Sequence, residues 1–348
     1  MMYSENYIAI PPGETIKEQL SQRAMTQKEF TLRMGMSSKH INRLINGNVE
    51  LTHQVSLKLE SVLGVPASFW NNLESTYREN LARVQDELNM HEEEEIAKLI
   101  PYAQIAKLGW VDSTRLIKDK VRNLRAFFEV SDLSLISNLP IPGVAFRIAN
   151  NKQKNNYALA VWTQKAKIEA RKEEVSTINI SKLKKRIQEI RSLSLEPFLT
   201  SVTKLSEIFS QCGIALVLLP HINDSYVHGA SFIDGKKIVL VLSTRGKNAD
   251  IFWFSLFHEL HHIIENHIKN YNNCDENEIS ADVYARDTLI LPNDYSCFVE
   301  KSNFSKDEIL EFSKKIGIHP GIVLGRLQKD NYVLFNYHTE LKDKYIIN

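Results

Sequence analysis

A chain of 348 residues, 43% hydrophobic and 24% charged, has the composition of an ordinary globular protein and is long enough for two or three domains. Its net charge of +1 excludes a general attraction to nucleic acid, so any contact with DNA must come from a local surface. The three widely spaced cysteines, Cys212, Cys274 and Cys297, argue against a disulfide framework. The longest apolar run, residues 214–219, is too short to cross a bilayer, and no secretory signal is visible, so we expect a cytoplasmic protein.

Residues 13–64 carry the pattern of a helix-turn-helix. After an amphipathic stretch, Thr26 and Glu29 form the sequence of a capping box at the start of a short helix. Ser37 caps a second short helix, which a helix-stop pair ends at residues 46–47. Because such motifs place their second helix in the major groove, we predict a DNA-binding domain.

The two faces of this pattern differ in chemistry. The positions expected in the core are Phe30, Met34, Met36, Ile41 and Leu44. The face left to solvent suits base edges and phosphates and consists of Ser38, Lys39, His40, Asn42 and Arg43. Residues 13–64 hold only seven Lys and Arg against five Asp and Glu, so a bundle that docks proteins is the alternative.

Two further helices, residues 52–63 and 66–83, complete a bundle of five. The stretch from residue 12 to residue 77, with Phe69-Trp70-x-x-Leu73 near its end, resembles the HigA-type antitoxins of the Xre group. The resemblance implies a phosphate anchored by Gln27, bases approached by Ser38, Lys39 and Arg43, and a backbone contact at Asn46. Relatives often carry Gln or Thr where this chain has Ser-Lys-His, so no operator sequence is implied.

Residues 86–200 are predicted to be largely helical. A turn is expected at residues 140–143 and a short extended piece at residues 144–148. Residues 165–191 form the most basic long segment, with nine Lys and Arg against four Asp and Glu. This segment is either a solvated helix face or a surface for the DNA backbone or a docked repressor.

From residue 201 the pattern becomes mixed. A helix to about residue 212 leads into a buried strand at residues 214–219. Residues 230–243 are typical of a hairpin with an Asp234-Gly235 turn. The sequence therefore predicts a small sheet before the next helix.

His258-Glu259-Leu260-His261-His262 is the one H-E-x-x-H in the chain. It lies in a segment without Gly or Pro that starts at Asp250, the expected N-cap, and is predicted as one largely buried helix. The side chains of His258 and His262 share one face of this helix and can bind one zinc ion. Glu259 is then placed to accept a proton from water that the metal activates.

A catalytic zinc takes a third protein ligand and keeps one position open. The metzincin spacing fails, since His267 comes nine residues after His258 and no Gly intervenes. Glu278 and Asp282 are i, i+4 partners on a predicted helix, where Glu278 would bind zinc and Asp282 would accept the distal N–H of His258. The rival third ligands that stay open are Glu276, Asp275, Cys274 and His267.

Three stretches here resemble the ImmA/IrrE family of metallopeptidases. They are Gly229–Gly235, the Phe-His-Glu-Leu-His-His helix, and Glu278-x-x-Ala281-Asp282-x-Tyr284-Ala285 with the following Leu-Ile-Leu-Pro292. Relatives usually have Gly at the position of His261 and Phe at that of Tyr284, and neither departure touches a proposed ligand. The resemblance implies a zinc peptidase that cleaves or otherwise controls a helix-turn-helix repressor.

A peptidase also needs a place for its substrate. In zinc peptidases of this general plan an edge strand near the metal pairs with an extended peptide, and residues 230–233 are the candidate for that strand. A plain core strand is the alternative. A further oxyanion donor is expected, with His228, Tyr226 and Tyr284 as candidates.

The C-terminal stretch, residues 305–328, is predicted as two short helices separated at residues 317–321, with Ser305 capping the first. The fold class expected is multidomain and mainly α with α+β. Its parts are a five-helix helix-turn-helix domain at 1–85, a helical connecting region at 86–200, a zincin-like α+β core with a small sheet at 201–300, and a helical cap at 301–348.

Together these features predict a cytoplasmic regulator or antitoxin that binds operator DNA as a homodimer. Its zinc peptidase site would hydrolyse peptide bonds of a regulatory protein or of the chain itself. The alternative is a non-catalytic repressor or antitoxin whose peptidase-like domain senses a signal or docks a toxin. Both hypotheses include operator binding, and they separate at the metal site.

Metal analysis of the purified protein tests the ligand set. We expect about one zinc per chain in the wild type and clearly less in His258→Ala and Glu278→Ala, because each variant loses one of three ligands. Unchanged zinc content in Glu278→Ala would move the third ligand to Glu276 or Cys274.

Overall fold

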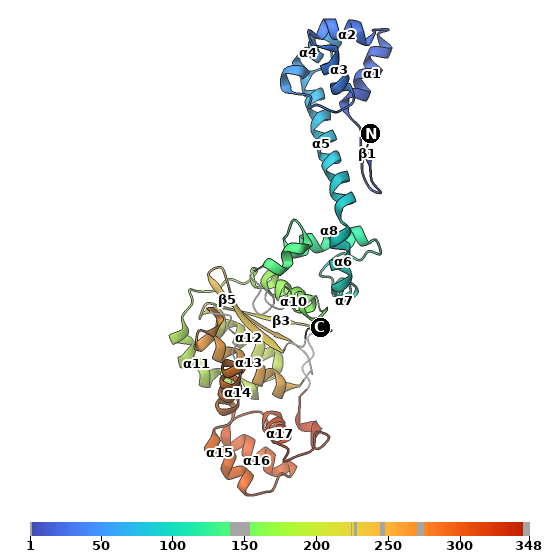
Figure 1. Cartoon of the computed structure of the whole chain (residues 1–348). Helices are drawn as coiled ribbons and strands as arrows, with labels where there is room; N and C mark the ends of the chain where they lie inside the picture. Colours follow the sequence, from blue (N-terminus) through green and yellow to red (C-terminus); the bar gives the residue numbers. More distant parts are fainter. Residues whose placement is uncertain are drawn as a thin grey trace. The chain divides into compact units, whose positions relative to one another are not determined.

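The computed structural model describes residues 2–139, 154–223, 225, 228–243, 248–269 and 275–343. It divides into two compact units, Met1–Glu95 and Ile96–Asn348, which are described in turn (Figure 1). The turn and the extended piece expected within residues 140–148 lie outside the described residues. The finer division at residues 85, 200 and 300 stays a prediction.

The first unit contains the five predicted helices. They are α1 (Pro12–Gln22), α2 (Gln27–Met34), α3 (Ser38–Ile45), α4 (His53–Leu63) and α5 (Ala67–Asn89). An antiparallel pair that the sequence did not predict, β1 (Met2–Tyr3) and β2 (Ile8–Ala9), precedes them. Ser4 and Asn6 between these strands donate hydrogen bonds of 2.7 and 2.8 Å to the buried carboxylate of Glu87 on α5, which fastens the pair to that helix.

The core of the first unit confirms the predicted buried face. Phe30, Met34, Ile41 and Leu44 are buried and Met36 is half-buried, around a fully buried Trp70. A Cβ at Gly13 would overlap the backbone carbonyl of Ile45, so only glycine lets α1 approach the end of α3 this closely. The helix-turn-helix geometry therefore depends on one residue without a side chain.

The helix caps of the motif form as predicted, but the capping box is incomplete. Thr26 Oγ1 accepts the backbone N–H of Glu29 at 3.2 Å, and Ser37 Oγ accepts that of His40 at 3.2 Å. The Glu29 carboxylate bonds Arg33, 2.7 Å away, in place of the Thr26 N–H that a full box would use. The Arg33 guanidinium lies one turn further along the same helix face and offers two charged donors. It therefore binds the Glu29 carboxylate more strongly than a single uncharged backbone N–H would.

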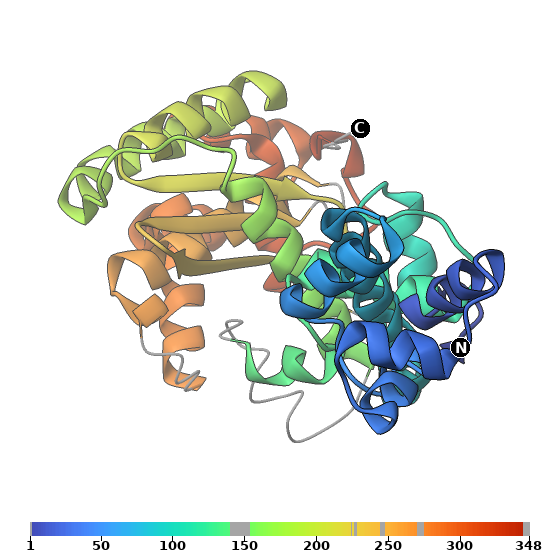
Figure 2. The ribbon, with the colours of Figure 1, turned by 90° about the horizontal axis from the view of Figure 1, so that it is seen from above.

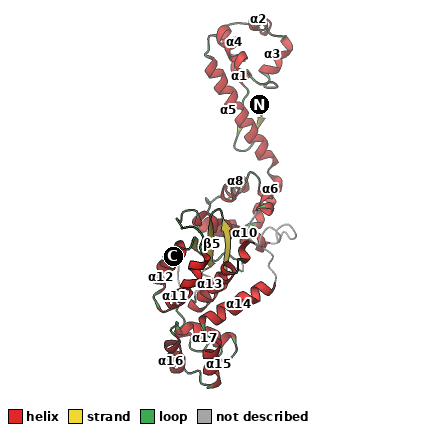
Figure 3. Ribbon diagram, turned by 90° about the vertical axis from the view of Figure 1, so that its left-hand side faces the viewer, coloured by secondary structure: helices red, strands yellow, loops and turns green. Residues whose placement is uncertain are grey.

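The second unit is mostly helical (Figure 3). Its helices are α7 (Tyr102–Lys107), α8 (Ile117–Phe128), α10 (Lys154–Ala170), α11 (Ile180–Ser192), α12 (Phe198–Ser210), α13 (Ala249–Ile264), α14 (Asp275–Leu289), α15 (Pro292–Glu300), α16 (Lys306–Ile316) and α17 (Pro320–Lys329), and α6 (His91–Leu99) spans the boundary between the units. Within the described ranges, short 3-10 turns lie at Leu133–Asn138, Leu193–Leu195, His267–Lys269 and Thr339–Leu341. In the described residues no helix is both long and apolar enough to cross a membrane.

A three-stranded sheet precedes α13 in the chain, with β3 (Ile214–Leu219), β5 (Lys237–Ser243) and β4 (Gly229–Asp234) side by side in that order (Figure 2). β3 runs parallel to β5, and β4 runs antiparallel to it and forms an edge. The predicted Asp234-Gly235 turn is shifted by one residue. Asp234 pairs with Lys237, and Gly235, at a φ of 61°, takes the first position of the turn, where a hairpin of this kind requires glycine.

Helices cover both faces of this sheet. Ile238, Leu240 and Leu242 of β5 belong to the large core that also contains α11, α12 and α13. The alternate residues, Val239 and Val241, are fully buried on the opposite face, where α10 contacts β3 and β5. The same alternation in β4 turns Gly229, Ser231 and Ile233 toward α13.

Arg191, near the end of α11, holds the C-terminal helices in place. Its guanidinium donates to the carbonyl oxygens of Thr288 and Leu289 at the end of α14, each at 3.0 Å. It also donates to those of Ile316 at 3.0 Å and Gly317 at 3.4 Å, at the end of α16. One cation therefore pairs with carbonyls that two helix ends would otherwise leave unsatisfied.

Loss of this cation should destabilise the fold. We expect Arg191→Ala to lower the free energy of unfolding by roughly 2–4 kcal/mol, because several partly buried carbonyls lose a charged donor. The matched control is Lys184→Ala on the same helix, since the exposed Lys184 lies 4.0 Å from Glu265 and contributes about 0.5 kcal/mol or less. Urea denaturation of the two variants measures the difference, and equal midpoints would contradict this role.

Candidate functional site

The helix that carries the H-E-x-x-H motif is α13, and it starts earlier than predicted. Its N-cap residue is Asn248, so the assignment of Asp250 as N-cap was wrong. Asp250 lies in the first turn, where its carboxylate accepts a hydrogen bond of 2.6 Å from Lys342. That ion pair fastens the C-terminal segment to the start of α13. The helix is largely buried, as predicted, with Trp253, Leu256, Phe257 and Leu260 fully enclosed.

Helices α13 and α14 bring three predicted ligands together. His258 Nε2 lies 3.2 Å from His262 Nε2 and 3.2 Å from Glu278 Oε2, and His262 Nε2 lies 3.6 Å from Glu278 Oε1. Among the described residues, these three form the one group of His, Cys, Asp and Glu side chains that could hold a metal ion. In a tetrahedral site with bonds of about 2.1 Å, neighbouring ligand atoms lie about 3.4 Å apart. The distances to the two Glu278 oxygens are close to this value, and one ligand atom from each of the three residues lies within 4.8 Å of the others, so the chemistry of the group is compatible with a zinc ion.

The two histidines of the cluster differ in electrostatics. Burial favours the neutral form of His258, but the hydrogen bonds and charges of Glu278, Glu259 and Asp282 outweigh it and raise the pKa of His258. Burial and the neighbouring charge of His258 lower the pKa of His262 to about 4, so that imidazole is neutral at pH 7. Asp282 Oδ1 lies 2.9 Å from His258 Nδ1, as expected of a residue that orients a ligand histidine.

Glu259 is buried against β4. Its Oε2 accepts a hydrogen bond of 2.7 Å from Ser231, and burial raises the pKa of Glu259 to about 7, against the opposing effect of that bond. A Cβ at Gly229 would lie 2.9 Å from Glu259 Cγ, so this position has no room for a side chain. Sequence reasoning missed Ser231, because its partner Glu259 lies 28 residues further along the chain on another element.

The other candidate metal ligands and the candidate oxyanion donors lie in different places. His267 Nδ1 lies 3.2 Å from His262 Nδ1, behind that ring rather than among the ligand atoms. Cys274, the Asp275 side chain and Tyr226 lie outside the described residues. Tyr284 packs on His261, with ring centroids 4.9 Å apart, and His228 is exposed beside β4. The choice of an oxyanion donor stays open.

The residues predicted to contact DNA lie in the first unit. Gln27, Ser38, Lys39, Arg43 and Asn46 are exposed, as that role requires. His40 differs from them, because it is half-buried and its Nε2 is enclosed without a hydrogen-bond partner among the described residues. A base contact from His40 therefore requires its ring to turn outward.

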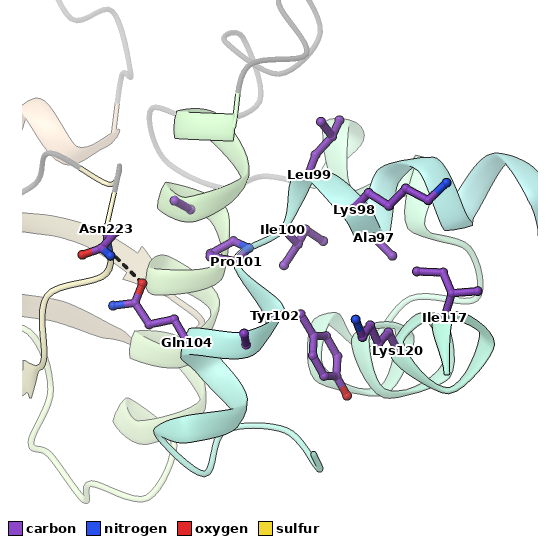
Figure 4. A pocket seen from close by; sticks show the side chains of 12 residues that line it. Ala97, Lys98, Leu99, Ile100, Pro101, Tyr102, Gln104, Ile117, Lys120 and Asn223 are labelled. Atoms are coloured by element: carbon purple, nitrogen blue, oxygen red, sulfur yellow. Dashed lines mark hydrogen bonds between the residues drawn. The ribbon is translucent and has the colours of Figure 1, made fainter. Parts of the chain in front are cut away.

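A cavity of about 530 Å³ in the second unit is separate from these residues (Figure 4). It is lined by residues 97–104 together with Ile117, Lys120, Ala158 and Asn223. Two of its polar side chains are hydrogen-bonded: Gln104 Oε1 accepts the Asn223 backbone N–H at 3.0 Å, and the Tyr102 hydroxyl donates to the Asp112 carbonyl at 2.7 Å. None of the predicted site residues lines this cavity, so it adds nothing to the metal cluster.

Comparison with known proteins identifies relatives of part of the chain. The helix-turn-helix family matches residues 16–70. The chain is similar to the uncharacterized HTH-type transcriptional regulator YddM of Escherichia coli (strain K12), at 30% identity over 66 residues, which are 19% of this chain and 70% of that protein. A solved structure of an addiction module antidote protein of the HigA family from Coxiella burnetii is 23% identical, with 24% of this chain and 94% of that chain covered. Its TM-score of 0.22 supports no conclusion about fold.

Proposed function

The chain belongs to the helix-turn-helix transcriptional regulators, and from this premise we propose that it binds operator DNA through α3 and carries a zinc peptidase site in its second unit. The peptidase part is supported above all by the spacing of the His258, His262 and Glu278 ligand atoms, all within 4.8 Å of one another. The substrate is a regulatory protein, because a peptidase joined to a repressor-like domain serves gene control.

Operator recognition rests on two exposed helix starts. α3 presents Ser38, Lys39 and Arg43 to solvent, and such side chains bond base edges and phosphates in the major groove. α2 begins at the exposed Gln27, where free backbone N–H groups and the helix dipole favour a phosphate. A homodimer would present two copies of α3 to half-sites one helical turn apart, about 34 Å.

Peptide hydrolysis rests on the cluster at α13 and α14. His258, His262 and Glu278 would hold a zinc ion and leave one position open. When bound, zinc lowers the pKa of water and polarises a peptide carbonyl. Glu259 takes the proton from the attacking water and returns it to the leaving amine, while Ser231 holds its carboxylate in place.

The edge strand β4 offers a seat for an extended substrate. In the described part of the sheet β4 pairs with β5 alone, so no described strand is paired with its other edge. A peptide added at this edge by backbone hydrogen bonds would run past the side of β4 that carries Ser231 and faces Glu259. This extends the sequence prediction for residues 230–233.

Selection of binding sites from random double-stranded DNA tests operator recognition. The full-length protein should enrich one motif of two half-sites, and Arg43→Ala should bind it about 5- to 100-fold more weakly, since a base contact is worth about 1–3 kcal/mol. Lys58→Ala on α4 removes the same charge from another exposed position and serves as the control. Failure to enrich any motif would overturn the DNA-binding half of the proposal.

Digestion of a proteome-derived peptide mixture tests the peptidase. Zinc-loaded wild type should cut a defined set of peptide bonds, which mass spectrometry identifies. Glu259→Gln should bind zinc as well as the wild type does but cut at least about 100-fold more slowly, because the general base is lost. The control is Glu265→Gln, which changes an exposed glutamate just after the end of α13 and should behave as wild type. A wild type that binds zinc without cutting any peptide, or itself, would favour the non-catalytic sensor or docking platform.

A further inference from the structure

The two histidines of the metal cluster each keep a second ring nitrogen besides the Nε2 that approaches Glu278. In His258 this Nδ1 lies 2.9 Å from Asp282. In His262 it lies 3.2 Å from Nδ1 of His267. Each ligand imidazole therefore has an outer partner, but one partner is a carboxylate and the other is a third imidazole.

Binding of a metal ion through His262 Nε2 would decide where the protons of His262 and His267 lie. A histidine that binds metal through Nε2 carries its proton on Nδ1. The His262 Nδ1–H then donates to the lone pair of His267 Nδ1, so the proton of a neutral His267 lies on its own Nε2. This arrangement holds the His262 ring in the tautomer and direction that the metal cluster needs.

The local fold places His267 for this contact. α13 ends at Ile264, and Asn266 follows in the left-handed conformation, with a φ of 62°, which Asn tolerates better than most residues. The chain thereby turns back, and Ile268, 5% exposed, anchors the next turn in the large core. His267 is thus held between a helix end and a core residue and reaches the outer side of His262.

We propose that His267 is a positioning residue for His262, through which it raises the affinity of the cluster for zinc. This inference rests on the zinc site proposed above and adds a residue that does not itself touch the metal. His261, the other histidine close by, has a different role: its Nε2 lies 3.0 Å from Ser280 Oγ and its ring packs on Tyr284.

Two substitutions separate positioning from packing. Asn carries its side-chain oxygen on the same carbon as His carries Nδ1, so His267→Asn keeps an acceptor but loses the ring. His267→Phe keeps a ring of similar size but has no acceptor. We expect His267→Phe to bind zinc about 10- to 100-fold more weakly than wild type and His267→Asn to stay within a few fold, as measured by competition of the full-length protein with a chelator.

The outcomes are distinguishable. If His267→Asn weakened zinc binding while His267→Phe kept full zinc affinity, the role of His267 would be packing alone and the proposal would be wrong. Unchanged zinc affinity in both variants would also overturn it. Thermal unfolding of the metal-free variants shows whether either substitution merely disturbs the fold. His267→Gln carries its acceptor one carbon further out, so it should bind zinc more weakly than His267→Asn because the acceptor no longer lies at the right distance from His262 Nδ1. A wild type that binds no zinc would overturn the zinc site itself, whatever the variants do.

Discussion

The cluster of His258, His262 and Glu278 depends on the close packing of α13 against α14. Each helix contributes residues one turn apart, His258 and His262 from one and Glu278 and Asp282 from the other, and they meet only when the two axes lie close. Ala281 and Ala285, both fully buried, face the neighbouring core with the smallest side chain that carries a Cβ. Arg191 of α11 bonds two carbonyl oxygens at the end of α14 and so ties that end of the helix to the core. The ligand spacing therefore depends on how these two helices pack against each other.

Much of the cluster could be predicted because helical periodicity converts spacing in sequence into spacing in space. The i, i+4 relation of His258 with His262, and of Glu278 with Asp282, needs only a helix to become a shared face. The same reasoning gave the core of the first unit, since apolar positions in short capped helices have little choice of side. Cap residues such as Thr26 and Ser37 were equally predictable, because their oxygen bonds a backbone N–H three residues away.

The features that prediction missed involve contacts between distant segments. The role of Asp250 is set by Lys342, and that of Ser231 by Glu259, so no local pattern reveals either. The hairpin turn moved by one residue because the pairing of Asp234 with Lys237 decides which residues lie at its tip. His267 was weighed as a ligand from its spacing alone. Its place behind His262 follows from the left-handed Asn266, which reverses the chain direction where a straight helix would have carried the ring away.

The absence of a side chain at Gly229 has a consequence for the evolution of this chain. A methyl group at that position would press on the Glu259 side chain, so any substitution there is coupled to the fate of the glutamate. If Glu259 acts as the general base proposed above, a side chain at position 229 would have to displace it, so the requirement for glycine would come from the chemistry of the site and not from the strand. We therefore expect the two positions, 30 residues apart along the chain, to change together in related sequences.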